Sequence, residues 1–388
     1  MVEFESRLAF EYVDKLVYEI GPRLAGTSAD AMAADYIREQ FKSFGLKVKS
    51  HEFKFVNRST RSKVTSFLLG IAFAASLLLA PMLSLLVWLA AIVLWRSLKR
   101  LMPKYQSQNV IATKKVEAPK KIIAVTAHYD SAQCWVSYKL LVFLKLTFLP
   151  LIALILAVLV LRVLGLVPVW PIVWVLLAAV FIPICVVMFV STSGRLVSPG
   201  AEDNASGTAV MLELARVIGE ESPEDTEVSF IAFGAEEQGL VGASKLAKDK
   251  LLASETLVLN LDMVGAGSQA YIIEGNGILR RRRTSSRINK ALKASIQRVG
   301  LSPKFWWVAF AGHDHIPLVK AGLQATTFSF DIPSVDELDC RIAKLFKIPN
   351  ARTRGYTHIH AIEDTPEHIK LETIEKAGAI ALDFIKTT

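Results

Sequence analysis

The stretch IIAVTAHYD, residues 122–130, decides the fold that we expect, because a short apolar run ends abruptly in a histidine and an aspartate. Such a run is typical of a strand that is covered on both faces. The pattern recurs as VSFIAFGAEE at 228–237 and as LVLNLD at 257–262, with helical spacing of apolar residues between them at 205–218. We therefore predict an α/β domain with a mixed, mostly parallel sheet flanked by helices. Further strands are expected at 46–55, 108–112, 306–310 and 326–330, and further helices at 30–44 and 369–385.

The composition is unusual for a soluble enzyme. The 388 residues are 52% apolar and 21% charged, with a formal charge of +9. This excludes a disordered or fibrous chain, and the three cysteines give no sign of a disulfide framework. The apolar excess is concentrated, because Ser66–Trp95 contains no charged residue and Leu140–Val190 contains only Lys145 and Arg162.

Two apolar insertions, 62–99 and 139–191, are long enough to enter a bilayer. A spanning helix needs about 20 apolar residues to cross about 30 Å of hydrocarbon. The second insertion holds two such lengths, 140–164 and 168–190, and the first holds two shorter ones on either side of Pro81. We predict two transmembrane helical hairpins, about four spans in all. A single tilted span, a re-entrant pair or a buried core helix stays open for the first insertion.

The residues beside the insertions predict the topology. Expected strands flank the first insertion, and one sheet cannot have members on both sides of a bilayer, so the number of crossings is even. Residues 1–61, 100–138 and 192–388 then form one domain. Lys and Arg gather where the insertions leave this domain, whereas the hairpin tips offer only Arg162. Because such residues favour the cytoplasmic side, we expect a multi-pass integral membrane protein whose catalytic domain is cytoplasmic.

Histidine and carboxylate side chains follow the expected strands. The carboxyl ends of parallel strands meet at one edge of a sheet, so these side chains are expected to converge. A single histidine or aspartate at the end of a strand is usually a surface or capping residue. Together, however, these residues are the ligand types that zinc prefers. Two metal ions need one shared carboxylate and separate terminal ligands, which this set supplies. It comprises His128, Asp130, Glu202, Asp203, Glu236, Glu237, Asp262, His358, His360 and Asp364.

The order of these motifs resembles the co-catalytic two-zinc aminopeptidases, the family that also includes glutamate carboxypeptidase, glutaminyl cyclase, the transferrin receptor and nicastrin. The resemblance covers nearly all of the chain outside the insertions, and neither insertion. It rests on HYDS at 128–131, GAEDNASG at 200–207, AEEQGL at 235–240, NLDMVG at 260–265 and His360 with DTP at 364–366. GPRLAG at 21–26 and Asp314-His315 are similar to flanking motifs of the family.

The resemblance implies a metal centre that holds two Zn²⁺ per chain. Asp203 is implied to bridge both ions. His128 and Asp262 complete one site, and Glu237 and His360 complete the other. His358 competes for the role of His360, but the spacing to Asp364-Thr365 favours His360.

The resemblance also implies the remaining catalytic roles. Glu236 is the implied general base, and Asp130 the partner of the second ring nitrogen of His128. Tyr356 and His315 are candidates for stabilising the oxyanion. Glu202 is one candidate for holding a substrate's free amine.

Together these features predict a membrane-bound two-zinc aminopeptidase that acts on hydrophobic or membrane-derived peptides. The second insertion separates Asp130 from Asp203, and linkers of roughly a dozen residues at about 3.6 Å each keep the zinc centre within about 45 Å of the bilayer. The expected partners are a peptide substrate and the lipid bilayer. Two alternatives stay open: an amidase or glutaminyl-cyclase-like enzyme on non-peptide amides, and a non-catalytic membrane scaffold or receptor.

The run Arg280–Arg283 is the one block of like charge. A solvated loop is its first interpretation, and contact with anionic lipid head groups its second. Much of the other positive charge lies beside the insertions, so the sequence does not indicate a nucleic-acid partner. It predicts no particular oligomeric state.

Overall fold

The computed structural model describes residues 2–134, 138–166, 171–191, 196–277, 280–308, 312–330 and 358–388. The chain divides into two compact units. The first, which we call the sheet unit, comprises Met1–Lys54, Gln106–Cys134 and Leu196–Thr388. The second, which we call the helical unit, comprises Phe55–Tyr105 and Trp135–Arg195.

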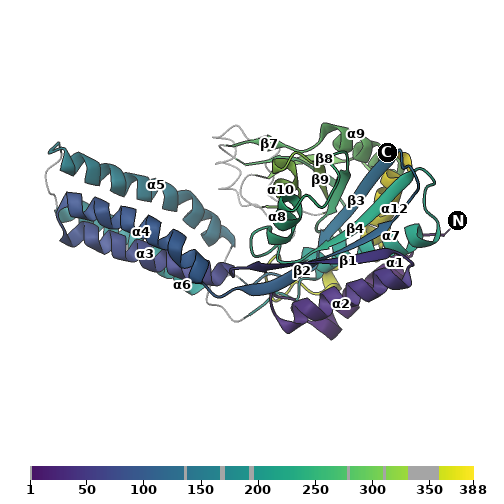
Figure 1. The fold of residues 1–388 in the computed structure, drawn as a ribbon, viewed down its shortest axis with the longest axis horizontal. Coiled ribbons are helices and arrows are strands. Elements are labelled where there is room, and N and C mark those ends of the chain that lie inside the picture. Colours follow the sequence, from purple (N-terminus) through teal and green to yellow (C-terminus); the bar gives the residue numbers. More distant parts are fainter. Residues whose placement is uncertain are drawn as a thin grey trace. The chain divides into compact units, whose positions relative to one another are not determined.

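The sheet unit is built on one mixed sheet, which contains nine strands in the described residues (Figure 1). The strands are β1 (Lys47–Phe55), β2 (Tyr105–Lys114), β3 (Lys121–His128), β4 (Thr226–Phe233), β5 (Leu257–Leu261), β6 (Tyr271–Asn276), β7 (Arg282–Arg283), β8 (Lys304–Val308) and β9 (Gln324–Ser329). Their order is β1-β2-β4-β3-β5-β9-β6-β7, and β8 pairs with β6. The central strands β4, β3, β5 and β9 are parallel, whereas β2 pairs antiparallel with β4 and β6 with β9. The structure thus confirms the expected mixed α/β sheet.

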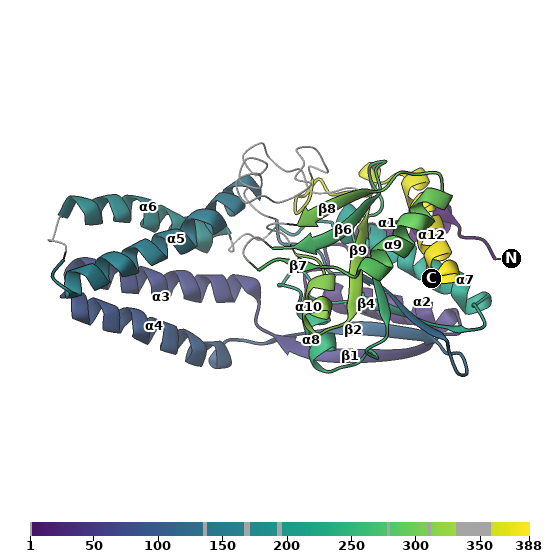
Figure 2. The ribbon, with the colours of Figure 1, turned by 90° about the horizontal axis from the view of Figure 1, so that it is seen from above.

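Helices cover both faces of this sheet (Figure 2). Ile123, Val125 and Ala127 of β3 point to one face and pack in the main core, whereas Ala124 belongs to a second cluster on the other face. The alternation follows from the two-residue period of a strand. The main core contains side chains of α1 (Ser6–Asp14), η1 (Lys15–Ile20), α2 (Ser28–Ser43), α7 (Ser206–Glu220), α9 (Ser286–Arg298) and α12 (Leu371–Thr387), and the second contains those of α8 (Val241–Lys248) and α10 (His315–Lys320).

The sequence analysis did not predict the helices α1, α8, α9 and α10, and it differs from the structure at the strands β7 and β6. Arg282 and Arg283 form the short strand β7 against β6, whereas a loop was expected for this run. We did not predict β6, because Glu274 and Gly275 interrupt its short apolar run. Residues 309 and 310 of the strand expected at 306–310 lie outside the described residues.

The helical unit contains four long helices, α3 (Arg58–Leu78), α4 (Pro81–Leu101), α5 (Tyr138–Val163) and α6 (Pro171–Ser191). Each of them packs against two of the others, so that they form a closed bundle. All four contribute to its core, which includes Phe73, Trp88, Leu159 and Phe181. A buried hydrogen bond joins α4 to α3, in which the Trp88 Nε1–H donates to Ser76 Oγ at 2.9 Å.

One helix of the described chain, Pro81–Leu101, is both long and apolar enough to cross a membrane. Two shorter apolar helical stretches are Pro150–Val163 and Val173–Val186. A helix of 21 residues is about 31 Å long at 1.5 Å per residue, which matches the hydrocarbon core. The two transmembrane hairpins stay a prediction.

Candidate metal centre

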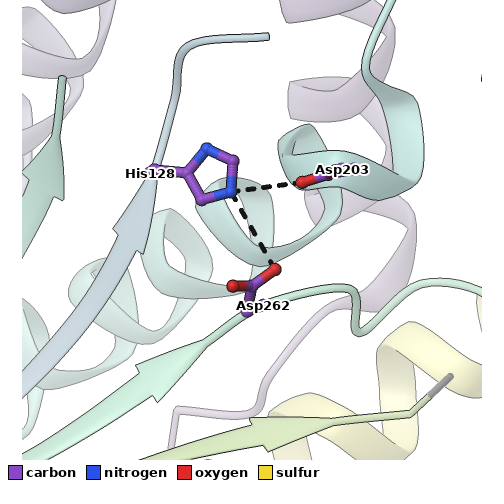
Figure 3. Close-up of side chains that lie close together, drawn as sticks. All are labelled: His128, Asp203 and Asp262. Carbon is purple, nitrogen blue, oxygen red and sulfur yellow. Dashed lines mark ion pairs between the residues drawn. The ribbon is translucent and has the colours of Figure 1, made fainter. Parts of the chain in front are cut away.

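Five side chains from distant parts of the sequence meet where the parallel strands end. They form two groups whose ligand atoms lie within 4.8 Å of one another: His128, Asp203 and Asp262, and Asp203, Glu237 and His360. Figure 3 shows the first group, with His128 at the end of β3 and Asp262 directly after β5. Asp203 lies in the irregular turn η2 (Ala201–Ala205), and Glu237 follows β4. Each group has the size of a single metal site.

Asp203 is the residue that the two groups share. Its Oδ1 lies 3.2 Å from His128 Nε2, and its Oδ2 lies 3.1 Å from His360 Nε2. Each group is completed by one more carboxylate, with Glu237 Oε1 at 3.1 Å from His360 Nε2 and Asp262 Oδ1 at 3.9 Å from His128 Nε2. A carboxylate that presents one oxygen to each of two histidines has the arrangement of a bridging ligand.

The chemistry of this donor set fits two zinc ions. Asp203, Glu237 and Asp262 are buried, and buried carboxylates are either paired or coordinate metals. Arg23 is a fully buried cation in the same region, but its guanidinium donates to main-chain oxygens such as Tyr129 O at 2.7 Å and Gly200 O at 2.8 Å. Imidazole nitrogen and carboxylate oxygen together suit zinc.

The carboxylates of the centre favour the protonated, positively charged form of both histidines. Burial lowers the pKa of His128, but the carboxylates of Asp130 and Asp203 outweigh burial and hold that pKa well above its ordinary value. The carboxylates of Glu237 and Asp203 likewise outweigh burial and raise the pKa of His360 to about 10. Because a metal-bound imidazole must be neutral, metal binding at this centre displaces protons.

Asp130 positions both His128 and the adjacent glutamates. Its carboxylate accepts the main-chain N–H of Glu236 at 2.9 Å and of Glu237 at 3.1 Å. The nearest acceptor to His128 Nδ1 is the main-chain oxygen of Asp130 at 3.1 Å, with the carboxylate Oδ1 at 3.7 Å. We expected the Asp130 carboxylate to be the partner of His128 Nδ1, but this distance is longer than the one to the main-chain oxygen. The carboxylate instead accepts the two main-chain N–H groups of Glu236 and Glu237.

Three non-glycine residues with positive φ lie at the centre. Ala235 (φ 56°) precedes Glu236, Met263 (φ 58°) follows Asp262, and His360 (φ 55°) is itself in the cluster. This left-handed region costs a non-glycine residue about 1–3 kcal/mol and is enriched at functional sites. The bends turn the chain sharply where the ligands must converge.

Glu236 is the acidic neighbour of Glu237 that belongs to neither metal group. Burial raises the pKa of Glu236 well above its ordinary value, and the charges of Glu237 and Asp314 raise it further, against the opposing charge of His128. A carboxylate with a raised pKa is suited to accepting a proton near neutral pH.

Two residues outside the cluster hold the η2 turn. Asp364 accepts the main-chain N–H groups of Glu202 at 2.8 Å and Asp203 at 3.1 Å. Arg23, from the GPRLAG motif, joins this turn to β3 because it binds both Gly200 O and Tyr129 O. Gly200 has φ 65°, and a Cβ there would lie 2.7 Å from Asp203 O, so only glycine fits.

His313 is a residue of the centre that the sequence analysis missed. Its Nδ1 lies 2.6 Å from Asp262 Oδ2, the oxygen that does not face His128, and Trp306 packs edge-on against its ring. His313 directly precedes Asp314-His315, the pair that is similar to a flanking motif of the family, and this position was the sequence feature that could have identified it.

His315 has a different environment from His313. It is completely buried, and its Nδ1 lies 2.7 Å from Thr327 Oγ1. Thr327 in turn accepts from Asn260 Nδ2 at 3.2 Å, and Asn260 Oδ1 accepts from Thr126 at 2.8 Å. This chain of polar groups joins α10 to three strands, so the contacts of His315 are structural ones. Its proposed contact with an oxyanion stays a prediction.

The remaining predicted residues are placed as follows. Glu202 is fully buried, and its Oε2 accepts the main-chain N–H of Gly265 at 2.9 Å; a contact with substrate stays a prediction. His358 stacks on His368 with ring centroids 4.3 Å apart, so of the two histidines His360 is the one in the cluster. Tyr356 lies outside the described residues.

The chain is similar in sequence to known peptidases. The profile of peptidase family M28 matches residues 186–385, more than half of the chain. Aminopeptidase YwaD of Bacillus subtilis is 32% identical over 188 residues, which are 47% of this chain and 36% of that protein. A "probable zinc metalloprotease" of Pyrenophora tritici-repentis is 54% identical over 70 residues, 18% of this chain and 16% of that protein. The chain thus spans about a third or less of these relatives' length.

Solved structures share the fold. A zinc aminopeptidase from Bacillus subtilis superposes with a TM-score of 0.59 at 20% identity, covering 99% of this chain and 95% of that one. A glutaminyl cyclase from Bacteroides thetaiotaomicron gives 0.59 at 16% identity, covering 100% and 99%. At these identities the likeness shows the fold alone.

Proposed function

The chain belongs to peptidase family M28, and from this premise we propose that it is a membrane-bound two-zinc aminopeptidase. The observation that carries the proposal is the position of Asp203, whose two carboxylate oxygens face two different histidines. His128 and Asp262 would hold one ion, and Glu237 and His360 the other.

Glu236 and Asp130 have different roles in the proposed reaction. Zinc, when bound, activates water and polarises a substrate carbonyl. Glu236 accepts the proton of the attacking water and returns it to the leaving amine. Asp130 accepts the main-chain N–H of Glu236 at 2.9 Å and so fixes the backbone from which the proposed base extends.

The surface of the helical unit supports the membrane part of the proposal. Most of the exposed large apolar side chains of the described residues belong to this unit. On α4, Leu89 is 60% and Val93 64% exposed, and on α6 Val175 is 61% exposed. Soluble monomers rarely expose an apolar surface of this extent, whereas a bilayer covers it. Lys99 and Arg100 in the last turn of α4 suit an interfacial position.

The proposed substrates are hydrophobic or membrane-derived peptides. The helical insertion Trp135–Arg195 separates Asp130 from Asp203, so the centre is tethered to the helical unit on both sides of the insertion. An enzyme attached to a bilayer meets peptides that partition into lipid at a raised local concentration.

A pair of adjacent substitutions tests the function. Glu236→Gln is expected to keep two zinc ions and lose about 10²- to 10⁴-fold in turnover, whereas Glu237→Gln is expected to lose zinc as well. Elemental analysis and hydrolysis of leucine p-nitroanilide by the full chain in detergent measure both. Glu224→Gln, at an exposed position, is the matched control and should behave as the parent.

The contrary results are distinct. Near-parental turnover in Glu236→Gln removes the assigned base. A zinc-loaded parent that cyclises a glutaminyl peptide but hydrolyses no aminoacyl substrate indicates the cyclase alternative, and a parent without either activity indicates a scaffold.

A further inference from the structure

A basic hollow of about 280 Å³ is lined by residues of β6, β7, β8 and α9. Strands β6 and β7 stand at the end of the sheet order (Figures 1 and 2). Three cations line it, Arg283, Lys290 and Lys293, against one acidic residue, Glu274. Arg283 is the last residue of the arginine run, which the proposed peptidase chemistry does not use. The hollow therefore combines a concave shape with an excess of positive charge.

Helix α9 presents two of its cations, Lys290 and Lys293, to the hollow. Asn289, Lys290 and Lys293 follow Ser286 at the i+3, i+4 and i+7 positions, and all four line the hollow. A different face buries Ile288 and Leu292 in the main core. The 13 residues of α9, SRINKALKASIQR, include no acidic residue. Neighbouring lysines repel one another, so the helix does not neutralise this face itself.

The cations are available to a ligand. Within the described parts of the chain, Arg283, Lys290 and Lys293 make no ion pair with an acidic side chain. The Arg283 guanidinium lies 6.0 Å from the centre of the Trp307 ring, which supports it from one side without neutralising its charge.

The wall of the hollow is fixed by hydrogen bonds. Asn289 Nδ2 donates to Thr284 Oγ1 at 2.9 Å, and the Thr284 hydroxyl donates to Ile273 O at 2.7 Å. Asn289 Oδ1 accepts from Thr326 Oγ1 at 2.7 Å. A wall that is ordered before binding lowers the cost of ordering a ligand against it.

We propose that this basic hollow binds a phosphate monoester. Such a group carries about −1.5 to −2 charges at neutral pH, which complements three cations and one carboxylate. Arginine and lysine are the side chains that proteins use for phosphate. At about 30 Å³ per water, the hollow has room for roughly nine waters, enough for a phosphate and a few carbon atoms. The group comes either from a soluble metabolite or from the head group of a lipid.

Calorimetry on the full, zinc-loaded chain in detergent tests this site with two probes. Glycerol 3-phosphate represents the soluble source and dioctanoyl phosphatidic acid the lipid source, with dioctanoyl phosphatidylcholine as the zwitterionic control. Lys290→Gln/Lys293→Gln is expected to weaken the binding of the phosphate probe at least tenfold. Lys47→Gln/Lys49→Gln removes the same charge from exposed positions of β1 and should leave binding within twofold of the parent. Both variants should keep parental peptidase activity.

Each outcome decides. Binding of glycerol 3-phosphate that is lost in the hollow variant supports the site with a soluble ligand, and loss seen only with phosphatidic acid supports it with a lipid. The proposal is overturned if neither probe binds, or if both double variants weaken binding equally. It is also overturned if binding survives in the hollow variant and disappears when zinc is stripped, because the anion then sits on the metal centre.

Discussion

The sheet unit and the helical unit differ in which side chains they bury and which they expose. In the sheet unit, Asp130, Asp203 and Arg23 are buried and held by specific partners, while the apolar side chains of the sheet are covered. In the helical unit, large apolar side chains such as Leu89 and Val93 are exposed. The difference is the one that the proposed membrane attachment predicts, because buried charge needs compensating partners and exposed apolar surface needs an apolar neighbour.

The largest effect is expected at Asp203, where the buried charge of the sheet unit is most concentrated. Asp203→Asn keeps the shape of the side chain but removes its charge and replaces one carboxylate oxygen by an NH₂ group that cannot bind a metal ion. Zinc should therefore be lost, and turnover should fall by about 10³-fold or more. Elemental analysis and the leucine p-nitroanilide assay measure the two effects, with Glu224→Gln as control. A variant that keeps two zinc ions and parental turnover contradicts the bridging role.

A buried acid away from the metal centre gives the next largest effect. Asp30 accepts from the Gly26 N–H at 2.9 Å and from Ser107 at 3.3 Å, and burial raises the pKa of its carboxyl from 3.8 to about 7. The folded state therefore holds this proton more tightly than the unfolded state. The stabilisation is complete below about pH 4 and is lost as the pH rises through about 7, by at most about 4 kcal/mol.

Asp30→Asn removes this titration. The melting temperature of the variant relative to the parent should rise between pH 5 and pH 8, because only the parent must ionise a buried carboxyl. Thermal unfolding of both chains in one detergent across this range measures the difference. Parallel curves would mean that Asp30 does not titrate in this window.

One lysine substitution in each unit tests whether the exposed apolar surface of the helical unit faces lipid. Leu89→Lys places a charge on the exposed face near the middle of α4, which should cost about 2.5–3.5 kcal/mol in a bilayer. Met32→Lys, at a 53% exposed position of α2 in the sheet unit, should change stability by no more than about 0.5 kcal/mol. Unfolding in nanodiscs compares the two. Equal and small effects indicate that water surrounds the helical unit.

The smallest effect is expected at His313, which contacts the centre through Asp262. His313→Ala should weaken zinc binding at the His128 site by about 10- to 100-fold, because residues that orient a ligand have effects of this size. Competition with a chelator measures the affinity of each site. His313→Gln retains a hydrogen-bond donor and should recover part of the loss; an unchanged affinity in His313→Ala shows that the contact does not support the metal.

These residues also show how far the sequence alone predicts the molecule. The strand that ends at His128 and the strands that precede Glu237 and Asp262 were predictable, because buried parallel strands leave uninterrupted apolar runs. The contact of His313 with Asp262 and the roles of Arg23 and Asp364 were not, because each joins one polar residue to a partner that is distant in the chain. In the helical unit, the length of the apolar runs predicted four helices, but not which of them pack against one another, because α5 and α6 are apolar on all sides.

X-ray absorption at the zinc edge tests the proposed zinc pair most directly. For the full chain loaded with zinc, we expect two ions per chain with nitrogen and oxygen ligands and a zinc–zinc distance of about 3.5–4 Å, lost in Asp203→Asn. A spectrum of isolated single ions, or one unchanged by Asp203→Asn, contradicts the account.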